Sequence, residues 1–131
     1  MLYDLDELRS CIAAGNVAIC NPPRVQRTFD KLGWPYTEDG AQEMFAVLLA
    51  LENVEFCYQK VSEQCKLTQN APRGVEYVDA DQFEIHWHPI LRVRRSESGP
   101  DTISFSTKIA RLVDDDGVYC GIVTFHLSPD L

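Results

Sequence analysis

The chain has 131 residues, a hydrophobic content of 45% and a formal net charge of −8 at pH 7. This length is enough to bury a core without disulfides or metals, and we expect residues 1–131 to form a single domain. The sequence has no run of about 18 apolar residues that could span a membrane. It has no secretory signal at its N-terminus, so we expect a cytoplasmic protein with no membrane association.

The charge and the cysteines narrow the function classes further. An acidic chain disfavours nucleic-acid binding, because neutralisation of phosphates supplies most of the non-specific affinity. Five cations nevertheless gather in one segment, and this clustering keeps RNA binding open: Arg92, Arg94, Arg95, Lys108 and Arg111. The five cysteines show no Cys-x-x-Cys spacing, which argues against a disulfide framework or a zinc knuckle.

Helix signals occupy the N-terminal part of the chain. The first helix is expected to begin after Asp4, which caps it, and to end at Gly15. The second is expected to begin at Pro22, where a missing N–H costs little, with Asn21 as its N-cap, and to end at Gly33.

A third helix is expected to begin near Thr37. Glu38 and Asp39 lie in its first turn, where negative charge favours the helix dipole. The apolar run over residues 44–51 predicts that this helix is the most buried of the three.

Strand signals follow in the C-terminal part. The segments expected to be extended are residues 54–61, 82–95, 102–113 and 118–127. The polar region 62–81 reads as a long loop with room for a short strand near residues 75–78, and residues 96–101 and 114–117 read as hairpin turns. This order predicts an α+β fold, with three N-terminal helices packed on an antiparallel sheet of about four strands.

Residues 82–95 read as one strand with two chemically opposite faces, because side chains alternate along a strand. The apolar set is expected in the core and comprises Phe83, Ile85, Trp87, Leu91 and Val93. The polar set is expected on an accessible surface and comprises Glu84, His86, His88, Arg92 and Arg94.

If the last three strands are neighbours, one sheet face carries a row of basic and imidazole groups: His86, His88, Arg92, Lys108 and His126. Such a face could cleave RNA without a metal, since a base can take the 2′-hydroxyl proton while a cation stabilises the phosphorane and an acid protonates the leaving oxygen. Histidine suits either proton-transfer role, because its reference pKa is about 6.5. A metal pair at His86 and His88, or an ordinary solvated sheet face, are the alternatives.

Short motifs in a fixed order resemble a particular bacterial family. They are Leu2-Tyr3-Asp4-Leu5-Asp6-Glu7-Leu8, Ala13-Ala14-Gly15-Asn16-Val17, Lys31-Leu32-Gly33, Glu55-Phe56-Cys57-Tyr58, Lys108-Ile109 and Val123-Thr124-Phe125-His126. In this order they are similar to the motility quorum-sensing regulator (MqsR) toxins. The resemblance covers most of the chain except residues 62–81 and 95–101, which look like insertions.

The resemblance implies a RelE-like fold and a metal-independent endoribonuclease of a toxin–antitoxin system that acts on messenger RNA, without metal or cofactor. It also implies a cognate antitoxin as protein partner. Three departures fall at functional positions. The family's lysine after Phe-Tyr aligns with Tyr58 or Gln59, or with Lys60 if a bulge intervenes; its tyrosine becomes Ser106; and its terminal lysine becomes His126.

We therefore expect a divergent member. The expected catalytic residues are His126, His86, Lys60 and Tyr58. The expected RNA- and phosphate-binding residues are Arg92, Lys108, His88 and Arg94. The alternative is a catalytically inactive, acidic interaction protein on the same scaffold that binds a protein partner, since an anionic surface suits basic partners and repels RNA.

Overall fold

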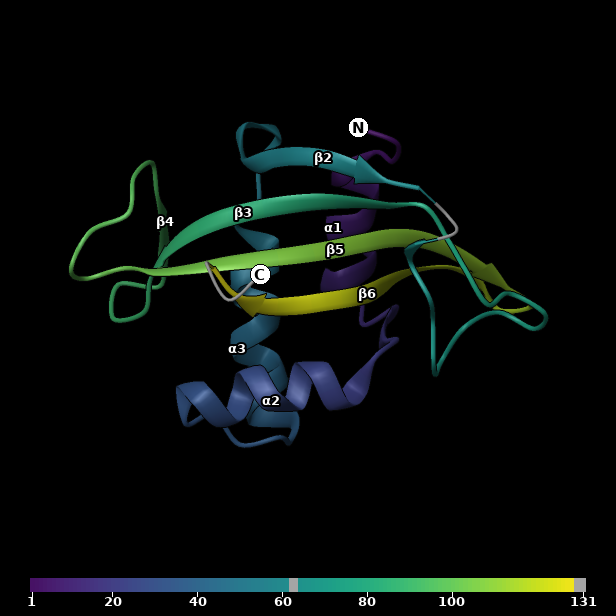
Figure 1. The fold of residues 1–131 in the computed structure, drawn as a ribbon, viewed down its shortest axis with the longest axis horizontal. Helices are drawn as coiled ribbons and strands as arrows, with labels where there is room; N and C mark the ends of the chain where they lie inside the picture. The colour runs from purple at the N-terminus through teal and green to yellow at the C-terminus, as the bar shows by residue number, and fades with distance from the viewer. Residues whose placement is uncertain (62–63, 129–131) are drawn as a thin grey trace.

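The structure, a computed structural model, describes residues 1–61 and 64–128. Its helices are α1 (Leu5–Ala13), α2 (Pro22–Leu32), α3 (Glu38–Leu49) and the short 3₁₀ helix η1 (Asn53–Glu55). Its strands are β1 (Val17–Ile19), β2 (Phe56–Lys60), β3 (Ala80–His88), β4 (Val93–Arg95), β5 (Ile103–Asp114) and β6 (Gly117–Leu127). In Figure 1, α1 and α3 pass behind the sheet, and α2 lies below its lower margin, beside β6. The expected α+β class and the three expected helices are confirmed.

The sheet has six strands rather than about four. Their order is β1-β6-β5-β3-β2, and β4 also pairs with β3. All pairs are antiparallel except β1 and β6, which are parallel. The strand β1 has only three residues, too few for a period-two pattern to be recognised. In the described residues, no helix is long and apolar enough to cross a membrane.

The expected single strand over residues 82–95 is wrong. The strand β3 ends at His88, the next residue is a proline without an N–H, and the chain reverses over residues 89–92. Arg92 takes a positive φ of 56°, and its N–H donates to the carbonyl oxygen of His88 at 2.8 Å. The strand β4 then returns along β3, with His88 opposite Val93.

This reversal changes two further expectations. Leu91 and Val93, which were expected in the core, are exposed, as is Ile90, because the alternation of β3 does not continue past the turn. Residues 96–101 do not form a hairpin turn either. Both β4 and β5 pair with β3, on opposite sides of it, so this loop crosses the end of β3. The expected turn at residues 114–117 is confirmed, with Gly117 at a φ of 119°.

The main core lies between the helices and one face of the sheet. Phe83, Ile85 and Trp87 of β3 are buried in it, as the alternation predicted. The rings of Phe105 and Phe125 stack with centroids 4.8 Å apart. The helix α3 contributes several side chains that are completely shielded from solvent, among them Met44, Val47 and Leu48.

The segment of residues 64–79 covers one end of the opposite sheet face. Its apolar side chains Cys65 and Leu67 pack with Ala110, Leu112 and Val123 of the sheet in a second, smaller core. The expected short strand near residues 75–78 is reduced to an isolated bridge between Lys66 and Tyr77. Residues 62 and 63 of the expected loop lie outside the described residues.

Candidate site on the polar sheet face

The rest of that sheet face carries polar side chains in rows that run across the strands. We call it the polar face and define it by Tyr58, Gln82, Glu84, His86, Ser104, Ser106, Lys108, Thr124 and His126. The first row is Tyr58–Gln82–Lys108–Thr124, the second is Glu84–Ser106–His126, and the third is His86–Ser104. Directly opposed residues in an antiparallel pair have Cβ atoms about 4.5–5.5 Å apart, so the members of each row are neighbours.

This geometry confirms one sequence expectation. The strands β3, β5 and β6 are adjacent, and His86, Lys108 and His126 therefore share a face. The imidazole Nδ1 of His86 lies 2.8 Å from the hydroxyl of Ser104. His126 is half-buried on β6 and is paired in register with Ser106.

A bulge in β2 brings Tyr58 to the polar face and Lys60 to its margin, opposite Ala80. The pairing of β2 with β3 shifts between Phe56 and Tyr58. The extra residue in β2 turns these two side chains to opposite faces of the sheet. Phe56 packs against Phe83 in the main core, with ring centroids 5.6 Å apart. Tyr58 pairs with Gln82 on the polar side. Without the bulge, strict alternation would put Phe56 and Tyr58 on the same face of the sheet.

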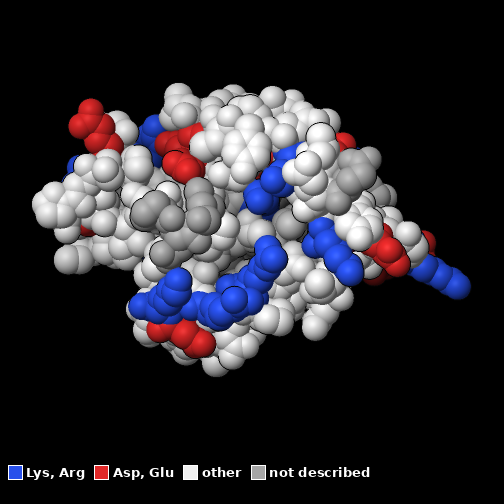
Figure 2. All heavy atoms as spheres, viewed as in Figure 1, with Lys and Arg blue, Asp and Glu red and all other residues white. Residues whose placement is uncertain are grey.

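Lys108 lies at the centre of a cluster of positive charge. It is half-buried, and burial, reinforced by the nearby Lys60 and Arg24, lowers its pKa. Arg24 of α2 and Lys66 of the segment 64–79 line one pocket with Lys108. Among the described residues, no ion pair involves these four cations, whereas Arg9, Arg92, Arg94 and Arg111 each have a carboxylate partner. Figure 2 shows blue side chains gathered where the sheet meets α2.

The sequence did not reveal Arg24 and Lys66 as members of this cluster. They lie far from each other and from Lys108 along the chain, and only the tertiary fold brings them together. No local motif marks either residue.

Three other expected binding residues have structural partners. Arg92 pairs with Glu43 of α3, and Arg94 pairs with Glu55 of η1. The hydrogen bond from Arg94 to Glu55 raises the pKa of the guanidinium. The expectation that Arg92 and Arg94 share a face with Lys108 is therefore wrong, because the reversal after His88 directs them toward the helix layer.

His88 also has partners, in the β3–β4 turn and in the loop that follows β4. Its Nδ1 accepts a hydrogen bond from the N–H of Leu91 at 3.0 Å, and its Nε2 lies 3.3 Å from a carboxylate oxygen of Asp101. The side chain is buried. These contacts hold the β3–β4 turn and the following loop together at one end of the sheet.

Three buried polar atoms of the polar face lack a hydrogen-bond partner in the described part of the chain. They are Gln82 Oε1, Ser106 Oγ and Thr124 Oγ1. Such atoms cost about 1–3 kcal/mol each and are rare in native proteins. Because all three belong to the first two rows, the polar face has unused hydrogen-bonding capacity beside its cations.

The cysteines near this face are poor nucleophiles. Burial raises the pKa of Cys65, although Lys108 and Lys60 oppose the shift. Burial also raises the pKa of Cys57, with Glu84 adding to the effect. Since the thiolate is the reactive form, both side chains stay protonated near neutral pH.

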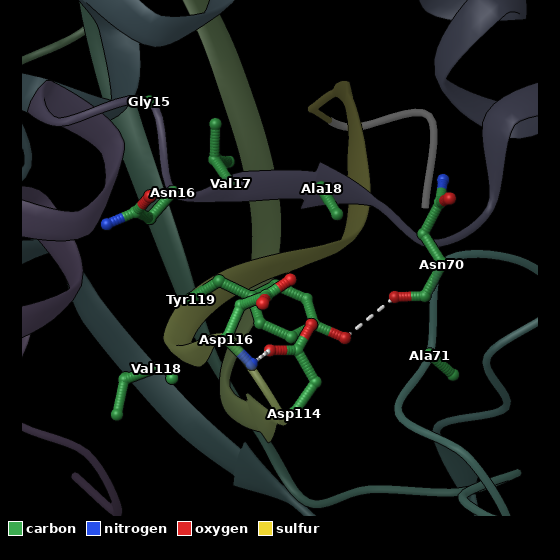
Figure 3. A pocket seen from close by; sticks show the side chains of 11 residues that line it. Gly15, Asn16, Val17, Ala18, Asn70, Ala71, Asp114, Asp116, Val118 and Tyr119 are labelled. Carbon is green, nitrogen blue, oxygen red and sulfur yellow. Dashed lines mark hydrogen bonds between the residues drawn. The ribbon is translucent and has the colours of Figure 1, made fainter.

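A larger cavity of about 410 Å³ lies elsewhere, beside β1 and the β5–β6 turn. Figure 3 shows Asn16, Asn70, Asp114 and Asp116 around it, with the hydroxyl of Tyr119 donating to the carbonyl oxygen of Asn70 at 2.8 Å. It holds none of the expected site residues and no Lys or Arg. In residues 1–61 and 64–128, no three His, Cys, Asp or Glu side chains are grouped so that they could hold a metal ion.

Comparisons of the chain with models of known protein families, with curated proteins and with solved structures found no match.

Proposed function

We propose that the protein acts on RNA as a metal-independent endoribonuclease and is a divergent MqsR-like toxin with a RelE-like fold. One observation carries this proposal. The row Glu84–Ser106–His126 lies directly beside Lys108 on the polar face, and Lys60 is close enough to Lys108 to lower its pKa. Proton-transfer groups, a half-buried cation and a second cation near it are thereby brought to one surface of an otherwise acidic protein.

The row supplies groups on both sides of a scissile phosphate. Glu84 and His126 are separated by two strand spacings, which places their backbones roughly 10 Å apart. Their side chains point to the same face and can bracket one phosphodiester between them. Both are only partly buried, so an RNA strand can reach them.

The chemistry follows from these positions. Glu84 takes the proton of a 2′-hydroxyl, the 2′-oxygen forms a bond to the adjacent phosphorus, and the bond from phosphorus to the 5′-oxygen breaks. Protonated His126 gives its proton to that 5′-oxygen. Lys60 and Lys108 stabilise the negative charge of the phosphorane. The products are a 2′,3′-cyclic phosphate and a 5′-hydroxyl, and His86 in the third row contacts the next nucleotide.

The test is cleavage of a defined RNA in the presence of EDTA. We expect His126→Ala to lower the rate at least about 100-fold, the usual contribution of a general acid, and Glu84→Gln to do the same. Arg73→Gln is a matched control, since Arg73 is exposed and lines none of the pockets described. Absence of cleavage by the wild-type protein, together with absence of RNA binding at low salt, would refute the proposal.

A second candidate is a non-catalytic protein that binds a partner, and the β3–β4 turn favours it. Ile90 is 84% exposed and Leu91 is 60% exposed, which is unusual for adjacent large apolar side chains. A cognate antitoxin is the partner expected for a toxin, so the two candidates share this surface. Stoichiometric co-purification of a partner that is lost in Ile90→Ser, combined with undetectable RNA affinity, would favour the second candidate.

A further inference from the structure

A small pocket adjoins the polar face at its margin with α2. Its volume is about 180 Å³, several times the volume of one water molecule, which is about 30 Å³. The wall comes from four separate segments: the start of α2, residues 64–68, β5 and β6. We call it the cationic pocket and define it by Asn21, Arg24, Gln64, Cys65, Lys66, Thr68, Lys108, Val123 and Thr124.

The charge of this pocket is positive and locally unbalanced. Arg24, Lys66 and Lys108 line it, Lys60 is close to Lys108, and no Asp or Glu is among the described residues that line it. The three lining cations belong to different segments, so the fold holds like charges together. Three such charges with no counterion among the described residues repel one another in the unliganded protein, and an anion in the pocket would relieve this repulsion.

The lining also includes a buried hydrogen-bonding group without a protein partner. Thr124 is 4% exposed, and its Oγ1 has no hydrogen bond to any described residue. A hydroxyl donates readily to an anionic oxygen. The start of α2 adds the positive end of a helix dipole, although Pro22 and Pro23 leave no N–H groups at the first two helical positions.

Asn21 fixes the pocket wall. Its side-chain amide donates to the carbonyl oxygens of Val123 at 2.8 Å and Lys66 at 3.2 Å, and its Oδ1 accepts from the hydroxyl of Thr68 at 3.1 Å. These bonds join α2, β6 and the segment 64–68. The cations therefore project from a wall that is tied together on three sides, which is the preorganisation that anion binding requires.

We propose that the cationic pocket binds a phosphate monoester, namely the terminal phosphate of an RNA strand. A monoester carries about −1.5 to −2 charge at pH 7, whereas an internal diester carries a single negative charge. The dianion matches the number of cations better, and a terminal group enters a small pocket without a chain leaving on the far side. The assignment of RNA rests on the proposed function; the affinity for a phosphate monoester does not.

This binding would set the register of the substrate. Lys108 belongs both to the pocket and to the first row of the polar face, so a strand held by its terminal phosphate passes directly onto the row Glu84–Ser106–His126. Cleavage is then expected near a phosphorylated end.

The first experiment measures binding of inorganic phosphate, 5′-adenosine monophosphate and adenosine by NMR titration at low salt. We expect saturable shifts with the two phosphates and none with adenosine. Arg24→Gln and Lys66→Gln should each weaken phosphate binding at least tenfold, and Arg73→Gln should not. Failure of both phosphates to bind overturns the proposal whatever the protein does to RNA.

The second experiment separates the sources of the phosphate. Oligoribonucleotides of one sequence, with a 5′-phosphate, a 3′-phosphate or hydroxyls at both ends, are compared in binding to the His126→Ala variant. We expect one phosphorylated form to bind at least tenfold more tightly than the hydroxyl form, and Arg24→Gln to remove the difference. Equal binding of all three forms overturns the terminal-phosphate assignment, even if the wild-type protein cleaves RNA.

Discussion

Asn21 can be interpreted either as the N-cap of α2 or as a bridge between segments of the pocket wall, and substitutions distinguish the two roles. As an N-cap, its side chain would accept a hydrogen bond from the first turn of α2, and substitution by alanine would cost about 1 kcal/mol. In the structure the side chain makes no capping hydrogen bond. It is 7% exposed and bridges Lys66, Thr68 and Val123 instead.

The structure therefore predicts a larger cost. Three hydrogen bonds at about 1 kcal/mol each give about 3 kcal/mol for Asn21→Ala, since the carbonyl oxygen of Val123 is left buried without this donor. Asn21→Asp discriminates more sharply. Aspartate caps helices as well as asparagine does, but it would turn an anionic oxygen toward two carbonyl oxygens that now accept from an amide.

The assay is equilibrium urea denaturation at pH 7, with Asn53→Ala on the exposed η1 helix as control. We expect Asn21→Asp to be at least as unstable as Asn21→Ala, and to recover part of its stability on acidification. The reason is that the introduced carboxyl should have a raised pKa in the folded state and would regain a donor when protonated. A stability of Asn21→Asp equal to that of the wild-type protein, with a loss of only about 1 kcal/mol in Asn21→Ala, would refute the bridging role.

Three further predictions concern stability. Asp81→Ala should lower the free energy of unfolding by about 3 kcal/mol in urea denaturation, because the buried carboxylate accepts hydrogen bonds from two N-terminal backbone N–H groups; an unchanged midpoint would contradict this. Lys108→Met should raise the unfolding midpoint at pH 7, with a gain that shrinks toward pH 10. Because the pKa of Lys108 is lowered in the folded protein, the unfolded chain binds this proton more tightly, and the charged lysine destabilises the folded state at pH 7. This destabilisation disappears as pH rises through the lowered pKa toward 10.5; a gain independent of pH would argue against it. Gly40→Ala should destabilise by more than about 2 kcal/mol, since its Cβ would lie 1.9 Å from the carbonyl oxygen of Pro35, whereas Gly99→Ala should be neutral; equal thermal midpoints for the two variants would exclude the clash.

Local signals predicted the elements whose ends have a local physical cause. Gly33 ends α2 in the left-handed conformation, with a φ of 71°. Gly117 allows the tight turn between β5 and β6. The alternation of Phe83, Ile85 and Trp87 correctly identified the core side of β3, because one face of that strand packs against helices.

The features that the sequence did not reveal depend on contacts between segments that are far apart along the chain. The strand β1 forms because its backbone pairs with β6, with Val17 opposite Cys120. Its three residues are too few to show the alternation of apolar and polar side chains by which a strand is recognised in a sequence. Pro89 did mark the end of β3, but the apolar residues after it suggested continuation. The bulge at β2 depends on the packing of Phe56 against Phe83, which no pattern within β2 records.

The same reasoning explains how an acidic chain can offer an anion-binding site. Net charge averages over the whole surface, whereas an ion in solution responds to charges within about one Debye length, roughly 8–10 Å at physiological salt. In this fold three glutamates form ion pairs with arginines and so join the helix layer to the sheet and to the β3–β4 hairpin: Glu7, Glu43 and Glu55. Among the described residues, Arg24, Lys66 and Lys108 have no ion pair and line the cationic pocket, and Lys60 lies near Lys108. A charge of −8 therefore disfavours non-specific association with nucleic acid but leaves a local site for one phosphate group, so the protein should bind RNA through few contacts and with a weak dependence on salt.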